Sequence, residues 1–96
     1  MDYKSRRWSR LRRSILDKDK CRCRQCQRYG LAVDATVVHH AYPAEDFPQY
    51  AWSRWNLISL CAGCHNAMHD RETGELTELG LSWRRRVSPP PPPATR

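Results

Sequence analysis

Two Cys-x-x-Cys pairs, Cys23 with Cys26 and Cys61 with Cys64, constrain the fold of this chain more than any other feature of its sequence. Each pair has the spacing that lets two thiolates bind one tetrahedral zinc ion from a single tight turn, and two such turns complete a four-cysteine site. Because that site has no open coordination position, we predict a structural zinc. Cys21 is predicted to be a spare thiol, although its Cys-x-Cys relation to Cys23 leaves open a role as a competing ligand.

The chain is short, so a metal site of this kind would be needed to stabilise its fold. A domain of 96 residues buries proportionally little surface and often depends on a metal or on disulfides. No apolar run approaches the length of a membrane span or of a signal-peptide core, so we expect a cytoplasmic protein without a membrane segment. In that reducing compartment paired cysteines are more often metal ligands than disulfides, and the odd count of five cysteines agrees.

The basic charge is concentrated at the N-terminus. Residues 1–28 hold eleven Lys and Arg against three acidic residues, whereas residues 29–70 hold one against four. Trp8, Leu11 and Ile15 recur at spacings of three and four, which predicts an amphipathic helix over about residues 3–17. Its other faces carry Arg6, Arg7, Arg10, Arg12 and Arg13. A basic face of this kind favours a phosphate-backbone partner over a merely solvated surface.

The remaining elements follow from short local patterns. The β-branched stretch ATVVHH, residues 35–40, predicts a strand that ends at two histidines, and NLISL, residues 56–60, predicts a second strand. Residues 41–52 predict an irregular loop that Phe47, Tyr50 and Trp52 pack onto the body, and residues 61–70 predict a helix. Residues 76–83 predict a packed segment of undecided type. The proline-rich residues 88–96 predict an extended solvated tail, with an SH3-type ligand as the alternative.

The four histidines form two close pairs, and the cysteine site leaves them without a structural role. His65 and His69 stand four residues apart on the predicted helix, so both side chains leave one face. Cys64 and His65 differ by about 100° around that helix and can therefore point at different metals. His39 and His40 face opposite ways on a regular strand. We infer that one of them completes a three-histidine metal site while the other serves as a general base.

The segment VVHHAYPAEDFPQYAWSRWNLISLCAGCHNAMH, residues 37–69, resembles the HNH endonuclease signature. It has a histidine pair on a strand, an asparagine before the second strand, and a Cys-x-x-Cys-His-Asn-x-x-His helix start. With the upstream cysteines and the basic helix, the resemblance runs from about Tyr3 to Arg71, and it is especially close to the small, zinc-stapled HNH proteins of bacteriophage and prophage genomes. It implies an α+β fold, the ββα-metal or His-Me finger, with its core at about 35–70 and zinc knuckles at 21–30 and 61–64. The nuclease domain would span residues 1–87.

The resemblance also implies a role for each matching residue. His40 stands at the position of the general base, and His39, His65 and His69 stand at the ligand positions of one catalytic divalent cation. Many relatives have Asp where His39 stands, but members with a tandem histidine match it. Asn56 matches the middle letter of the signature and is expected at the catalytic site, with its role in shaping the loop or in holding the metal left open. The implied activity is hydrolysis of DNA phosphodiester bonds with Mg, Mn, Ni, Co or Zn, of which the imidazole set suits Mg least.

Two other readings of the same residues remain open. A zinc-stabilised DNA-binding module that never cuts would share the fold and the charge, but it has no need for His40 outside the metal set. Redox-active dithiols are disfavoured because no βαβ pattern surrounds the cysteine pairs. The resemblance implies DNA as partner and, among phage relatives, the terminase or other packaging proteins. A monomer would nick DNA, whereas a homodimer would cut both strands.

Overall fold

The protein is represented by a computed structural model that describes residues 1–87. The predicted proline-rich tail lies outside the described residues. The elements in chain order are α1 (Arg6–Lys18), α2 (Arg24–Gln27), β1 (Val37–His40), η1 (Pro48–Tyr50), η2 (Arg54–Asn56), β2 (Leu57–Leu60), α3 (Ala62–Asn66) and α4 (Glu78–Val87). This order confirms the predicted α+β class. Among the described helices, none combines the length and apolar character that crossing a membrane requires.

Helix α1 begins at Arg6 rather than at Tyr3 because Ser5 caps it. The Ser5 hydroxyl accepts the Trp8 backbone N–H at 3.1 Å, which satisfies one of the amides that a helix start leaves unpaired. The helix ends at Lys18, and the carboxylate of the following Asp19 accepts the backbone N–H of Ser59 at 3.2 Å. This contact joins the end of α1 to the second strand.

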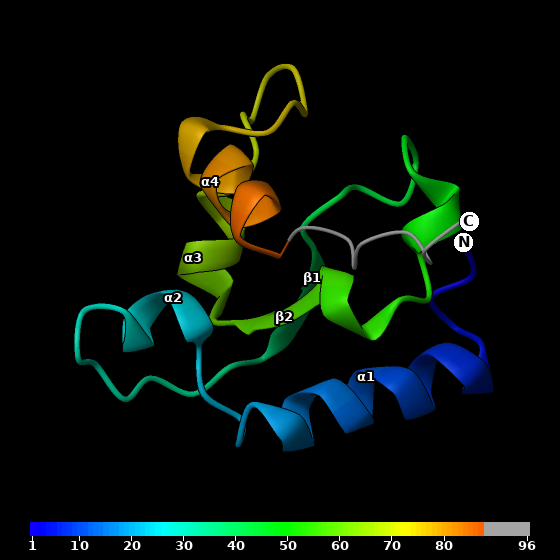
Figure 1. The fold of residues 1–96 in the computed structure, drawn as a ribbon, viewed down its shortest axis with the longest axis horizontal. Helices are drawn as coiled ribbons and strands as arrows, with labels where there is room; N and C mark the ends of the chain where they lie inside the picture. Colours follow the sequence, from blue (N-terminus) through cyan, green and yellow to red (C-terminus); the bar gives the residue numbers. More distant parts are fainter. Residues whose placement is uncertain (88–96) are drawn as a thin grey trace, which may run out of the picture.

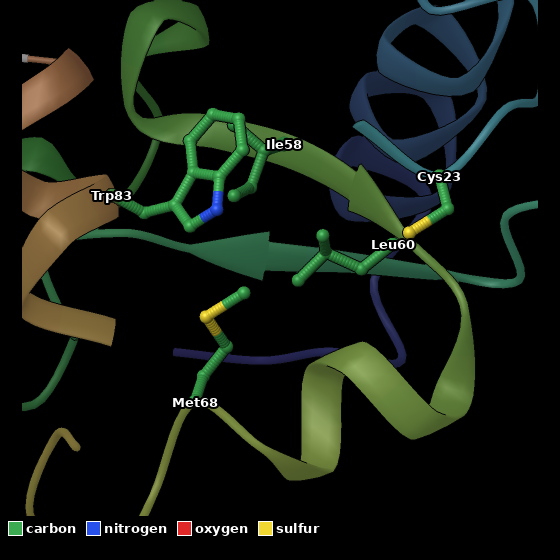
Figure 2. Packing of buried hydrophobic residues seen from close by; sticks show 5 residues of the cluster. All are labelled: Cys23, Ile58, Leu60, Met68 and Trp83. Carbon is green, nitrogen blue, oxygen red and sulfur yellow. The ribbon is translucent and has the colours of Figure 1, made fainter. Parts of the chain in front are cut away.

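The two strands form an antiparallel sheet in which Val37 lies opposite Leu60 and His40 lies opposite Leu57. In Figure 1 the sheet lies between α1 on one side and α3 and α4 on the other. Because strand side chains alternate, the sheet contributes to a separate core on each face. The core against α1 consists of Trp8, Ile15, Val38 and Leu57. The core on the opposite face, drawn in Figure 2, consists of Cys23, Ile58, Leu60, Met68 and Trp83.

The predicted helix over residues 61–70 is much shorter than expected, because α3 ends at Asn66. Beyond it the chain pairs with a later segment: Thr77 donates its backbone N–H to Met68 at 2.9 Å, and Asp70 donates to Glu75 at 2.7 Å. This hairpin uses the backbone groups that further helical turns would need. The prediction that His65 and His69 lie on one helical face was therefore wrong.

Residues 76–83, whose type the sequence pattern did not decide, belong mostly to α4. This helix packs closely on the hairpin at Gly80, where an added Cβ would lie 2.4 Å from the Met68 carbonyl oxygen. We expect Gly80→Ala to lower the free energy of unfolding by about 1–3 kcal/mol, because backbone must move to admit the methyl group. Gly63→Ala is the matched control, since nothing lies within 4 Å of a Cβ there. Thermal melts of both variants test this, and equal melting temperatures would contradict it.

Candidate active site

The four paired cysteines converge from two distant parts of the chain. Their ligand atoms all lie within 4.8 Å of one another, and the Sγ atoms of Cys26 and Cys64 are 3.7 Å apart. A tetrahedral site with Zn–S bonds of about 2.3 Å has S–S edges of about 3.8 Å, so the cluster fits one zinc ion. Cys21 is exposed and lies outside the cluster, and all five cysteines are free thiols.

The cysteine cluster is continuous with the core that Figure 2 shows. Cys23 is fully buried and lies beside Leu60 in this core. Burial works to raise the pKa of Cys23, but hydrogen bonds from Cys26, Cys61 and Cys64 outweigh it and lower the pKa to about 7. A metal bound here would therefore join α2, the end of β2 and the start of α3 next to the core that Figure 2 shows.

Three of the four histidines meet at a second point. His39 comes from β1, His65 from α3 and His69 from the hairpin, and their ligand atoms lie within 4.8 Å of one another. The ring centroid of His39 is 5.3 Å from that of His65 and 5.5 Å from that of His69. The structure thus brings together the three residues expected to bind the catalytic ion, although His69 reaches the site from a hairpin instead of a helix.

Hydrogen bonding and burial prepare these rings as ligands. His69 Nδ1 lies 3.1 Å from the Gly74 carbonyl oxygen and donates to it, so Nε2 is the ring nitrogen left to bind a metal. Burial, followed by repulsion from His65, His69 and His40, lowers the pKa of His39 to about 3, so this ring is neutral. Within residues 1–87, His39 Nε2 is the buried side-chain atom that has no hydrogen-bond partner. Three imidazole nitrogens that lie close together, among them this unpaired atom, fit a divalent cation.

His40 lies on the opposite face of β1 and outside the three-histidine cluster. Its Nε2 is 2.9 Å from the Ala51 carbonyl oxygen, and its ring stacks on Trp8 with centroids 5.3 Å apart. A carbonyl only accepts hydrogen bonds, so Nε2 carries the proton and Nδ1 keeps the lone pair. Burial lowers the pKa of His40, against the opposing effect of the Ala51 hydrogen bond. The ring is therefore held neutral in the tautomer that makes Nδ1 a base.

A single hollow of about 920 Å³ joins the two sets of histidines. It lies along the outer edge of β1, the edge that is not paired with β2. His39 and His40 point to opposite faces of β1, but side chains on both faces can reach a space at the edge of a strand. Both histidines therefore line the hollow. The general-base candidate and the three-imidazole cluster therefore face one space from two sides.

Asn56 holds the loop beside this hollow and does not line it. Its side chain is fully buried and accepts the Tyr42 backbone N–H at 2.6 Å. The Nδ2 group donates to the carbonyl oxygens of Tyr42 at 3.0 Å and Tyr50 at 3.2 Å. Phe47 and Tyr50 pack against Tyr42 within the loop. Of the three aromatic residues predicted to pack the loop onto the body, Trp52 contacts Trp8 of α1. Ala51, which follows Tyr50, supplies the carbonyl that orients His40.

Of the five helix arginines expected to bind DNA, Arg12 is the one that lines the hollow, and it donates to the Thr36 carbonyl oxygen at 2.8 Å. Arg6, Arg10 and Arg13 are exposed on α1. The guanidinium of Arg7 lies 3.8 Å from the ring centroid of Trp52.

Arg84 of α4 also lines the hollow, beside the aromatic loop, with its guanidinium 5.4 Å from the Tyr42 ring. Arg84 was not predicted at the site from the sequence. The run of three arginines at residues 84–86 could have indicated a DNA contact. The sequence pattern did not decide whether the preceding residues 76–83 form a helix, so the position of this run could not be predicted.

Comparisons with known proteins agree with this geometry. The family model described as HNH endonuclease matches residues 23–71, which is just over half of the chain. Among solved structures, the chain matches the crystal structure of the deep-sea thermophilic bacteriophage GVE2 HNH endonuclease with manganese ion. The TM-score is 0.65 and the identity 36%, over 67% of this chain and 70% of that chain. A search of curated proteins found no match. The chain therefore belongs to the HNH endonuclease family and is a nuclease that hydrolyses phosphodiester bonds.

Proposed function

We propose that this nuclease is a metal-dependent DNA endonuclease in which His40 activates water, while His39, His65 and His69 hold one divalent cation. The observation that carries the proposal is the arrangement at the edge of β1. Three imidazoles converge within 4.8 Å, and the fourth faces the same hollow with its Nε2 hydrogen-bonded to Ala51. A purely structural second metal site would not need His40 held in this tautomer beside it.

In the proposed reaction, His40 Nδ1 takes a proton from a water molecule as the water oxygen bonds to the scissile phosphorus. The bond from phosphorus to the 3′ oxygen breaks, and the departing 3′ oxygen takes a proton from solvent water, so the products are a 5′ phosphate and a 3′ hydroxyl. The Ala51 carbonyl stays hydrogen-bonded to Nε2–H and stabilises the positive ring that forms. A cation bound by the three histidines would stabilise the charge that develops on the phosphate and on the departing oxygen.

The basic residues around the hollow are proposed to position the DNA. Arg12 and Arg84 line it and would contact phosphates next to the cut. The exposed face of Arg6, Arg10 and Arg13 would extend these contacts along the backbone, which gives affinity with little sequence information. Asn56 is proposed as a positioning residue, because its three hydrogen bonds hold the loop that presents Ala51 to His40.

We assign zinc to the cysteine cluster because four thiolates in tetrahedral spacing suit that ion. For the histidine cluster we propose manganese or a related divalent cation. The matched bacteriophage enzyme was crystallised with manganese, and imidazole donors suit Mn, Ni, Co or Zn better than Mg. We propose the reducing cytoplasm as the place of action, since free thiols persist there. Partnership with a phage terminase, or dimerisation to cut both strands, stays a prediction.

Metal content tests the two-site arrangement directly. The parent protein is expected to bind one zinc ion and, in addition, one manganese ion per chain, measured by elemental analysis and by calorimetric titration. His65→Ala removes one of three donors and is expected to abolish tight manganese binding and plasmid cleavage while the zinc remains. Asn66→Ala, at the exposed neighbouring position on α3, is the matched control. If manganese binds His65→Ala as tightly as the parent, the proposed ligand set is incorrect.

A further inference from the structure

A second hollow, of about 480 Å³, lies apart from the candidate active site and has a strongly basic lining. The end of α1, α2, η2 and α4 each contribute to it. Five cationic side chains line it: Lys18, Arg24, Arg28, Arg54 and Arg86. No carboxylate residue lines this hollow within the described part of the chain. Like charges gathered in this way repel one another and concentrate a positive potential that attracts an anionic ligand.

Helix α4 separates the two hollows. Leu81 and Arg84 line the active-site hollow, whereas Trp83 and Arg86 line the basic one. Consecutive helical residues point about 100° apart, so one short helix serves both spaces with different faces. The two hollows share no lining residue within the described chain. The basic hollow is therefore a distinct feature and not an extension of the histidine site.

The basic hollow has a fixed aromatic floor. Trp83 is 2% exposed, and its indole N–H donates to the Gln25 side-chain oxygen at 2.7 Å. The guanidinium groups of Arg24 and Arg86 lie 5.1 Å and 5.6 Å from the Trp83 ring centroid. Contact with an aromatic face orients a guanidinium without neutralising it. Among the described residues, Arg24, Arg28 and Arg86 form no salt bridge, so their charges are available to a ligand.

We propose that the basic hollow is a second DNA-contact site, which binds phosphates of the backbone away from the scissile bond. The inference rests on the proposed DNA substrate. Five cations contributed by four elements suit a chain of phosphates better than a single anion. Neutralising those phosphates releases counterions, so the site would add salt-sensitive affinity without reading bases. The nuclease would then hold DNA on both sides of α4.

The salt dependence of DNA binding tests this proposal. Arg28→Glu/Arg86→Glu changes two elements of the basic hollow in the full chain, and Lys20→Glu/Arg71→Glu makes the same change in net charge outside both hollows. Binding to a fluorescent duplex is measured from 50 to 200 mM salt without divalent cations. The slope of log Kd against log salt is expected to fall by about 2 in the first variant. Because this contribution vanishes near 1 M salt, the loss at 0.1 M is about 100-fold. The control is expected to keep the parental slope.

Equal slopes for the two charge-reversal variants would overturn the proposal. Melting temperature and zinc content are measured in parallel, and Arg28→Gln/Arg86→Gln replaces the reversal variant if Glu at these positions prevents folding. His40→Ala, measured in the same binding titration and then in plasmid cleavage with manganese, separates this proposal from the catalytic one. Cleavage that persists in His40→Ala would refute His40 as the base. The second site would then still be judged by the salt dependence of the charge-reversal variants. Cleavage that is lost, with equal slopes in the paired variants, would refute the second site alone.

Discussion

His40→Ala is expected to lower the rate of plasmid cleavage by about 10²–10⁴-fold, the usual contribution of a general base. The expectation follows from geometry. The Ala51 carbonyl fixes the proton on Nε2, the Trp8 ring fixes the plane of the imidazole, and Nδ1 is left as the basic atom beside the hollow. Removing the ring leaves the water without a proton acceptor, while the three-histidine cluster keeps all of its donors.

The measurement is conversion of supercoiled plasmid with manganese, magnesium, nickel or zinc added in turn. His40→Gln is the informative companion variant, because its amide can donate a hydrogen bond to Ala51 but offers no basic nitrogen. It is expected to be as inactive as His40→Ala and closer to the parent in melting temperature. Cleavage by His40→Gln at the parental rate would remove His40 from the mechanism. Absence of cleavage by the parent with every ion would favour a DNA-binding module that does not cut.

Cys61→Ala is expected to leave the chain largely unfolded. Apparent binding energies of structural zinc reach about 10–16 kcal/mol in small zinc domains, whereas a whole domain is stable by about 5–15 kcal/mol. Cys23 of this cluster also belongs to the core on the sheet face opposite α1. With three thiolates the zinc is bound weakly, and the start of α3, which carries His65, loses its attachment to α2.

Circular dichroism, zinc content and cleavage are measured together on Cys61→Ala. Cys21→Ala is the matched control, because Cys21 is exposed, lies outside the cluster and already has a positive φ of 55° that Ala would share. It is expected to fold and bind zinc like the parent, with a change in stability within about 0.5 kcal/mol. Were Cys61→Ala to melt like the parent, the zinc site would not be what stabilises the fold.

The parts of this structure that the sequence predicted are those with local causes. The spacing of the cysteine pairs is a property of a single turn, so the cluster could be expected before any fold was known. Strand alternation likewise separates His39 from His40 over one residue, and the apolar spacing of Trp8 and Ile15 is visible within α1. The predicted start of α1 was about one turn too early. The helix begins at Arg6 because Ser5, in an extended conformation, caps its first turn.

The sequence by itself determined which residues are candidates for the chemistry, and that His39 and His40 leave opposite faces of β1. Only the tertiary structure decided how these residues come together. His69 reaches the cluster through a hairpin and is oriented by Gly74, His40 receives its tautomer from Ala51, and Arg84 comes to the hollow on α4. Each of these depends on a backbone carbonyl or a helix brought in from elsewhere in the chain. Local periodicity reports which way a side chain faces, whereas the identity of its distant partner is settled only when the chain packs.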